Sequence, residues 1–193
     1  MNFYEKNHIT YFNSTVNIDP AAFLDPLAGV IAPKSTILDV GCGSGRDLLW
    51  LAEREFMPTG FEKSSNLARL ARQHAACPVI EGDFRDFDFS QLSFAALVLV
   101  GSLVHLSQAE FPTIFEKICK ALAPEGHILI TLKEGVGTSS TADGRFFTLW
   151  SATDLEAVFT SQGLKILDFS RQVSRLRPDD IWLGYVLRAV NGR

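Results

Sequence analysis

The stretch that decides the fold is ILDVGCGSGRD, residues 37–47. Its apolar first half is typical of a buried strand, and the glycines after it predict a tight turn into an amphipathic helix. Gly41 and Gly43 remove side chains where a ligand could approach the backbone, and a helix that begins near Gly45 directs unpaired amides toward the end of the strand. The stretch therefore predicts a ligand site between a strand and a helix.

Two kinds of ligand use such a turn. The dinucleotide fingerprint GxGxxG needs a third glycine so that the helix packs closely on the strand, and Arg46 occupies that position here. Asp39 lies two residues before the first glycine, where its negative charge would repel a pyrophosphate and attract an ammonium. The turn therefore favours a zwitterionic ligand.

Short apolar runs alternate with amphipathic stretches along the rest of the chain, a pattern typical of repeated βα units. We predict one doubly wound, Rossmann-like α/β domain over residues 1–193, with a mostly parallel seven-stranded sheet and an antiparallel last strand. The strands are expected at Thr36–Val40, Met57–Glu62, Val79–Glu81, Ala95–Val100, His127–Leu132, Leu164–Ser170 and Ile181–Leu187. Helices between the strands are expected at Asp47–Arg54, Asn66–Ala75, Gln108–Leu122 and Thr153–Gln162.

The first 34 residues precede the first strand and hold two helical candidates, Phe3–Phe12 and Pro20–Val30. They are rich in aromatic side chains, and we expect them to form a helical lid over a cofactor-binding core at residues 35–193.

The segment LDVGCGSG resembles the first motif of class I S-adenosylmethionine-dependent methyltransferases, whose cofactor has both an ammonium and a carboxylate in its methionine moiety. The resemblance implies S-adenosylmethionine as cofactor and S-adenosylhomocysteine as product. Glu62 resembles the acidic residue that binds both ribose hydroxyls, and its alternative is a surface carboxylate. In EGDFRDF, residues 81–87, Asp83 resembles the residue that binds the adenine amino group, and Phe84 the one that packs on the ring.

Arg46 has two interpretations, a partner for the methionine carboxylate or an ion pair with Asp47 or Glu53. The cofactor-binding residues that the resemblance implies are Asp39, Gly41, Cys42, Gly43, Arg46, Glu62, Lys63, Asp83, Phe84, Val100 and Gly101.

The resemblance extends along most of the chain. LKEG at 132–135 and GRFFTLWS at 144–151 are similar to a bacterial subgroup of small methyltransferases, and GCGSGR is loosely similar to the tellurite-resistance type. This similarity implies a small-molecule methyl acceptor.

Two residues are candidates for catalysis. His105 follows the fourth strand, where it would serve as a general base or would instead pack under the loop, and Tyr11 comes from the N-terminal segment. Other candidates for the wall of the acceptor pocket are Tyr4, Lys133, Glu134, Arg145, Phe146 and Trp182. The sequence predicts no metal site.

Composition narrows the choice of partners. The net charge of −4 argues against a protein that grips nucleic acid through its phosphates. The one basic cluster, at Arg171, Arg175 and Arg177, is interleaved with aspartates and predicts a solvated face. No apolar run approaches the roughly 18 to 20 residues that span a bilayer, and the N-terminus lacks the apolar core of a signal peptide, so we expect a cytoplasmic protein. The sequence leaves the oligomeric state open.

Three functions are compatible with these motifs. The first is an enzyme that methylates an oxygen, nitrogen or sulfur of a small molecule. The second is a non-catalytic S-adenosylmethionine-binding sensor or partner subunit, which an open apolar face would indicate. The third is a protein or tRNA methyltransferase, which a basic track leading to the pocket would indicate.

Overall fold

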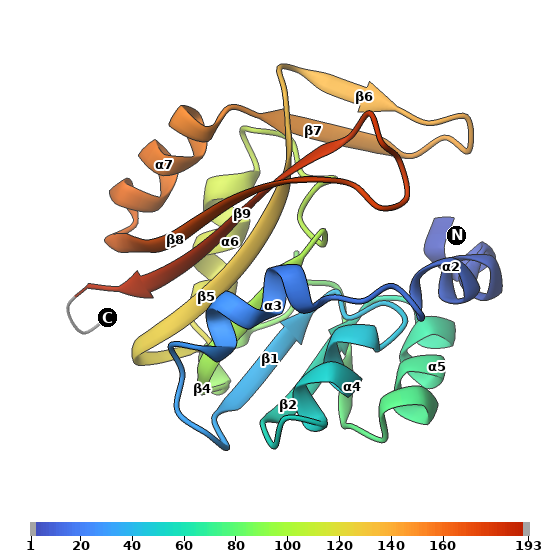
Figure 1. Cartoon of the computed structure of the whole chain (residues 1–193), viewed down its shortest axis with the longest axis horizontal. Coiled ribbons are helices and arrows are strands. Elements are labelled where there is room, and N and C mark those ends of the chain that lie inside the picture. Colours follow the sequence, from blue (N-terminus) through green and yellow to red (C-terminus); the bar gives the residue numbers. More distant parts are fainter. Residues whose placement is uncertain (1–2, 191–193) are drawn as a thin grey trace.

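A mixed sheet of nine strands runs through residues 3–190, the part of the chain that the computed structural model describes (Figure 1). The strands are β1 (Thr36–Val40), β2 (Met57–Glu62), β3 (Val79–Glu81), β4 (Phe94–Val100), β5 (Leu122–Glu134), β6 (Thr138–Ser140), β7 (Phe146–Trp150), β8 (Leu164–Val173) and β9 (Ile181–Ala189). The order is β3-β2-β1-β4-β5, and β5 then pairs with both β7 and β9. These pairs are parallel except β5 with β9, so the predicted doubly wound α/β fold is confirmed.

The prediction of seven strands is wrong, because β6 and β7 form an additional hairpin beside the end of β5. Thr138 pairs with Thr148 within the hairpin, and Lys133 of β5 pairs with Leu149 of β7. The segment 138–140 is short and its residues are polar, so no apolar pattern predicts a strand at β6. The pairing with the extended β5, which runs on to Glu134, makes the hairpin part of the sheet.

Helices cover both faces of the sheet (Figure 1). They are α1 (Phe3–Lys6), α2 (His8–Thr15), α3 (Ala21–Ala28), α4 (Arg46–Ala52), α5 (Ser65–Ala75), α6 (Phe111–Cys119) and α7 (Ala152–Ser161). Apolar side chains of α3 and α4, such as Leu27 and Trp50, form one buried cluster, while Phe115 of α6 and Phe159 of α7 belong to another. None of the described helices is long and apolar enough to cross a membrane.

The helix predicted at Gln108–Leu122 is shorter than expected. The Ser107 hydroxyl donates a hydrogen bond of 2.7 Å to Glu110 Oε2, and this contact closes a turn just before α6 begins at Phe111. At the other end, Leu122 already pairs with Phe94 as the first residue of β5.

The strand order reverses direction between β1 and β4, which lie side by side in the middle of the sheet. In open α/β sheets, ligands bind beyond the carboxyl ends of the strands at such a point. The N-terminal helices α1 and α2 pack against α5 beside this end of the sheet (Figure 1). The topology therefore predicts a ligand site formed by the turn after β1 and the loop after β4.

Candidate cofactor and acceptor site

The glycine-rich turn after β1 depends on backbone conformations that favour glycine. Gly41, Gly43 and Gly45 have φ angles of 77°, 54° and 76°. A Cβ atom at Gly41 would lie 2.6 Å from the Cβ of Ser102, a distance that real Cβ atoms essentially never show. The turn therefore approaches the loop after β4 as closely as the backbone allows.

A cavity of about 300 Å³ lies over this turn. It brings together eight of the residues predicted to bind the cofactor: Gly41, Gly43, Glu62, Lys63, Asp83, Phe84, Val100 and Gly101. Both candidates for catalysis, Tyr11 and His105, also line it. Three predicted cofactor residues lie outside the lining: Asp39 and Cys42 are buried beneath the turn, and Arg46 faces a neighbouring cavity.

Glu62 is held in place by the backbone around it. Its Oε2 accepts a hydrogen bond of 3.0 Å from the Gly43 amide, and its Oε1 accepts one of 2.8 Å from the Ser64 amide. Only 7% of Glu62 is exposed, so the alternative of a surface carboxylate is wrong, and burial raises the pKa of its carboxyl group. Each carboxylate oxygen has a second lone pair that could accept a hydroxyl.

Asp39 and Ser102 supply the strongest sign that a polar ligand belongs here. The Oδ2 atom of Asp39 and the Oγ atom of Ser102 are buried and have no hydrogen-bond partner among the described residues. Burial, reinforced by the charge of Asp47, raises the pKa of Asp39 well above its ordinary value. A positively charged group nearby would offset this cost, which fits a ligand that has an ammonium.

Arg46 forms a bidentate ion pair with Asp47, with distances of 2.6 Å from Nε to Oδ1 and 3.0 Å from Nη2 to Oδ2. Of its two predicted interpretations, the structure shows the ion pair with Asp47.

In the wall of the smaller cavity, Lys63 Nζ lies 2.5 Å from Asp83 Oδ2. Burial of Asp83 opposes ionisation, but hydrogen bonds from Lys63 and the Arg85 amide outweigh it and lower the pKa of its carboxyl group. An ionised Asp83 beside the ring of Phe84 could accept a hydrogen bond from an exocyclic amine.

Part of the chain is similar to known methyltransferases. Residues 37–126 match the family model described as a methyltransferase domain. The dTDP-3-amino-3,6-dideoxy-alpha-D-glucopyranose N,N-dimethyltransferase of Streptomyces fradiae is 32% identical over 113 residues, covering 57% of this chain and 44% of that protein. The O-methyltransferase cnsE of Penicillium expansum is 26% identical over 157 residues, covering 74% and 56%. The chain thus spans about half the length of these curated relatives.

Solved structures agree on the fold. The 1,6-didemethyltoxoflavin-N1-methyltransferase of Burkholderia thailandensis, crystallised with 1,6-didemethyltoxoflavin and S-adenosylhomocysteine, superposes with a TM-score of 0.75 at 18% identity, covering 98% of this chain and 88% of that one. A TehB-like methyltransferase from Corynebacterium glutamicum gives 0.70 at 19% identity, covering 97% and 98%. The fold of the described residues is therefore similar to that of S-adenosylmethionine-dependent methyltransferases, and residues 37–126 match a methyltransferase domain.

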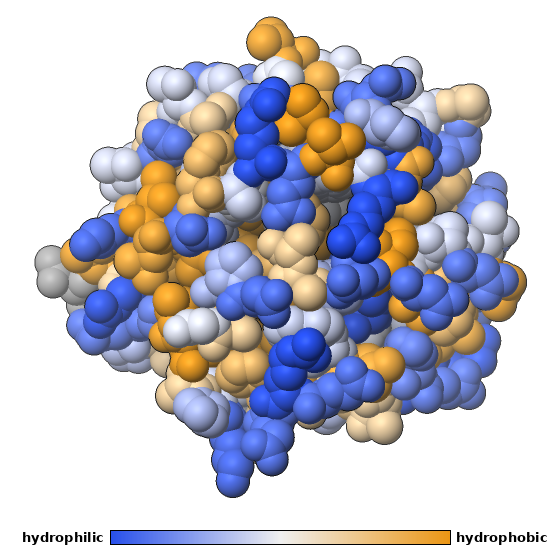
Figure 2. Space-filling view, viewed as in Figure 1, coloured by the Kyte–Doolittle hydropathy of each residue, from blue (hydrophilic) through white to orange (hydrophobic). Residues whose placement is uncertain are grey.

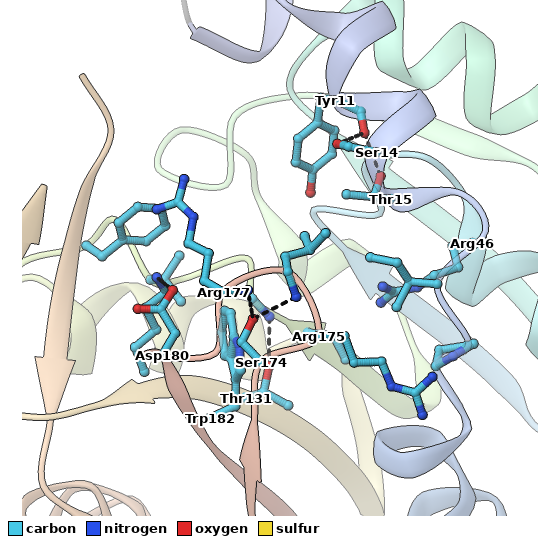
Figure 3. A pocket seen from close by; sticks show the side chains of 18 of the residues that line it. Tyr11, Ser14, Thr15, Arg46, Thr131, Ser174, Arg175, Arg177, Asp180 and Trp182 are labelled. Atoms are coloured by element: carbon cyan, nitrogen blue, oxygen red, sulfur yellow. Dashed lines mark hydrogen bonds and ion pairs between the residues drawn. The ribbon is translucent and has the colours of Figure 1, made fainter. Parts of the chain in front are cut away.

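A second, larger cavity of about 560 Å³ adjoins the first (Figure 3). Both cavities share wall residues Phe3, Tyr4, Tyr11, Val100, Gly101 and Arg145. In Figure 3, Tyr11, Ser14 and Thr15 of α2 form one side, and Ser174, Arg175 and Arg177 of the loop between β8 and β9 approach from another. The larger cavity is therefore the space in which a second substrate could meet a ligand bound over the turn.

His105 is hydrogen-bonded through both ring nitrogens. Its Nδ1 donates to the backbone carbonyl of Phe146, which only accepts, so Nε2 is the lone-pair nitrogen and accepts from the Tyr4 hydroxyl at 2.6 Å. Burial lowers the pKa of His105 and raises that of the Tyr4 phenol, so both groups are neutral near pH 7. Tyr4, rather than His105, lines both cavities.

Some of the residues predicted for an acceptor wall line the larger cavity. Tyr4, Lys133, Arg145 and Trp182 line the larger cavity, while Glu134 and Phe146 do not. Sequence reasoning missed Phe3 and the loop residues Ser174–Arg177. Arg175 and Arg177 were expected on a solvated face, and no sequence signal distinguishes them from Arg171, which pairs with Glu134 outside the cavity.

Proposed function

We propose that this protein transfers the methyl group of S-adenosylmethionine to an oxygen, nitrogen or sulfur atom of a small-molecule acceptor. The observation that carries the proposal is the pair of adjoining cavities, one over the glycine-rich turn and one beside it, with Tyr4, Tyr11 and Gly101 in the walls of both. S-adenosylmethionine supplies an electrophilic methyl group, which leaves its sulfur as the acceptor attacks from the opposite side.

The cofactor roles expected from the resemblance fit the smaller cavity. We assign the ribose hydroxyls to Glu62, the adenine amine to Asp83 and the ring face to Phe84, with the methionine ammonium near Asp39. The unpartnered Asp39 Oδ2 and the close approach of Gly41 to Ser102 support this assignment.

The protein's main contribution to rate is positioning, since holding an acceptor atom behind the methyl group can supply about 7–11 kcal/mol in favourable cases. For acceptors that must lose a proton, we assign that step to Tyr4 and His105. The Tyr4 hydroxyl takes the acceptor's proton while its own moves to Nε2 of His105, which leaves an imidazolium and a neutral phenol.

We further propose that residues 1–34 act as a lid, with residues 35–193 as the cofactor-binding core. Phe3, Tyr4 and Tyr11 of this segment line both cavities, and an aromatic wall over the cavities favours an enzyme over a binding subunit. One curated relative is named for the methylation of a dTDP-linked amino sugar, which supports a small acceptor. The three cysteines are free, in keeping with a cytoplasmic location.

Calorimetric titration with S-adenosylmethionine, and separately with NAD, tests the cofactor assignment. We expect micromolar binding of the first and none of the second. Asp39→Ala and Glu62→Ala should each weaken binding by about 1–3 kcal/mol, the cost of losing a partner of a charged or buried group. Unchanged affinity in both variants would overturn the assignment of these two residues to the cofactor. Once cofactor binding is established, a screen of small thiols, phenols and amines as methyl acceptors tests methyl transfer itself.

A further inference from the structure

The larger cavity has an excess of positive charge, although the whole chain has a net charge of −4. Its cationic wall residues are Arg46, Lys133, Arg145, Arg175 and Arg177. Its acidic wall residues are Asp19, Asp143 and Asp180. Strongly hydrophilic side chains also gather on the outer face where the β8–β9 loop approaches the N-terminal helices (Figure 2).

Close ion pairs neutralise three of the five cations: Arg46 with Asp47 at 2.6 Å, Lys133 with Asp180 at 2.5 Å and Arg145 with Asp143 at 2.7 Å. The other two are different. Arg175 approaches Asp19 only to 4.0 Å, and both side chains are more than half exposed, so water screens the pair. Within residues 3–190, Arg177 has no carboxylate at ion-pair distance.

The loop that bears these two arginines is held in shape by its own hydrogen bonds. Ser174 Oγ accepts from the amides of Leu176 and Arg177 at 3.3 and 3.2 Å, and the Ser174 amide donates to the Asp180 carbonyl at 2.8 Å. The ion pair from Asp180 to the buried Lys133 ties the loop to β5. Arg175 and Arg177 therefore line the cavity from a fixed base, and their side chains leave the loop toward different sides (Figure 3).

We propose that the methyl acceptor has an anionic group, a carboxylate or a phosphate, which binds Arg177 while its reactive atom lies near Tyr4, with Arg175 on the same loop adding positive charge. That the anion belongs to a methyl acceptor rests on the proposed function. That the cavity binds an anion does not depend on it. The planar guanidinium group of Arg177 matches both oxyanions through paired hydrogen bonds.

Pyrophosphate and succinate are the probes. Each is titrated calorimetrically into the full chain, with and without saturating S-adenosylhomocysteine. The variants are the double substitution Arg175→Gln with Arg177→Gln, and the control Arg171→Gln. Arg171 is on the same β8–β9 unit but pairs with Glu134 outside the cavity, so the control removes one charge of the protein without changing the cavity wall.

We expect at least one probe to bind the wild-type protein, and the double substitution to weaken that binding about tenfold or more, as for loss of a charge-assisted pair. Arg171→Gln should stay within about twofold, since exposed charges contribute little. A preference for pyrophosphate would identify a phosphate, and a preference for succinate a carboxylate. Binding of neither probe, or equal loss in the control, would overturn the proposal. Binding of a probe without binding of S-adenosylhomocysteine would overturn the proposed function alone.

Discussion

The Tyr4 hydroxyl lies 2.6 Å from Nε2 of His105, so the lone pair of the histidine points at the tyrosine instead of the open cavity. The other ring nitrogen is engaged by the Phe146 carbonyl, which fixes the tautomer. Tyr4 comes from α1 and His105 from the loop after β4, so the contact also joins the N-terminal segment to the core. An acceptor in the larger cavity would meet Tyr4 first.

Substitution of either partner should slow methylation of acceptors that must lose a proton. For Tyr4→Phe and His105→Gln we expect kcat to fall by about 10²-fold or more, the usual contribution of a positioned proton acceptor, with little change in cofactor affinity. Tyr185→Phe is the matched control, because Tyr185 is a buried tyrosine bonded to Glu156 away from both cavities. A kcat of Tyr4→Phe equal to that of the wild type would exclude the relay.

The pH dependence of kcat should follow the protonation of the His105 imidazole. Burial places its pKa below the ordinary 6.5, so the imidazole stays neutral and able to accept a proton at pH 7. As the pH falls below that lowered pKa, the ring gains a proton and the rate should drop. We expect His105→Gln to be slow at every pH between 5 and 8 and to lack this acidic limb. If the variant keeps the limb, another group causes it.

Asp39 should link cofactor binding to stability. Its folded-state pKa lies above the ordinary 3.8, so its contribution to stability is complete below that value and is lost as the pH rises through the folded pKa. Urea unfolding of the ligand-free protein should therefore show a smaller loss of stability from pH 5 to 8 in Asp39→Asn than in the wild type. The same variant should bind S-adenosylmethionine about 1–3 kcal/mol more weakly.

Asp25→Asn on the exposed side of α3 is the control for this experiment, since it removes one carboxylate that lies outside both cavities. It should follow the wild type in both measurements. Identical pH dependence of Asp39→Asn and the wild type would mean that the buried carboxylate costs the fold nothing.

The parts of the fold that the sequence predicts well are those in which the pattern is local. β1, β2 and β3 have the predicted bounds, since buried parallel strands read as short apolar runs, and the turn after β1 is marked by its glycines. The hairpin of β6 and β7 was missed because its place in the sheet depends on pairing with the end of β5.

The site divides in the same way. The location of Glu62 beside the turn can be predicted from its position at the end of β2. The contact between Tyr4 and His105 cannot be predicted, because the two residues are 101 positions apart and no periodic pattern links them. Arg175 and Arg177 resemble solvated charges in the sequence, because only the loop's hydrogen bonds and the ion pair from Asp180 to Lys133 decide where they point.

The turn after β1 can be tested with two glycines of nearly equal conformation. Gly41 has a φ of 77° and Gly137 a φ of 76°, so alanine carries a similar backbone strain of about 1–2 kcal/mol at both. They differ in surroundings: a Cβ at Gly41 would clash with Ser102 at 2.6 Å, whereas nothing lies within 4 Å at Gly137.

Gly41→Ala should therefore lose more free energy of unfolding than Gly137→Ala, by about 1–3 kcal/mol, the usual cost of forcing an extra carbon into a packed site. It should also bind S-adenosylmethionine more weakly, since relief of the clash moves the turn away from the loop after β4. Urea unfolding and calorimetry on both variants measure the two effects. Equal stability and equal affinity in the pair would mean that the turn can shift freely, and that its closeness to Ser102 is not needed for the ligand.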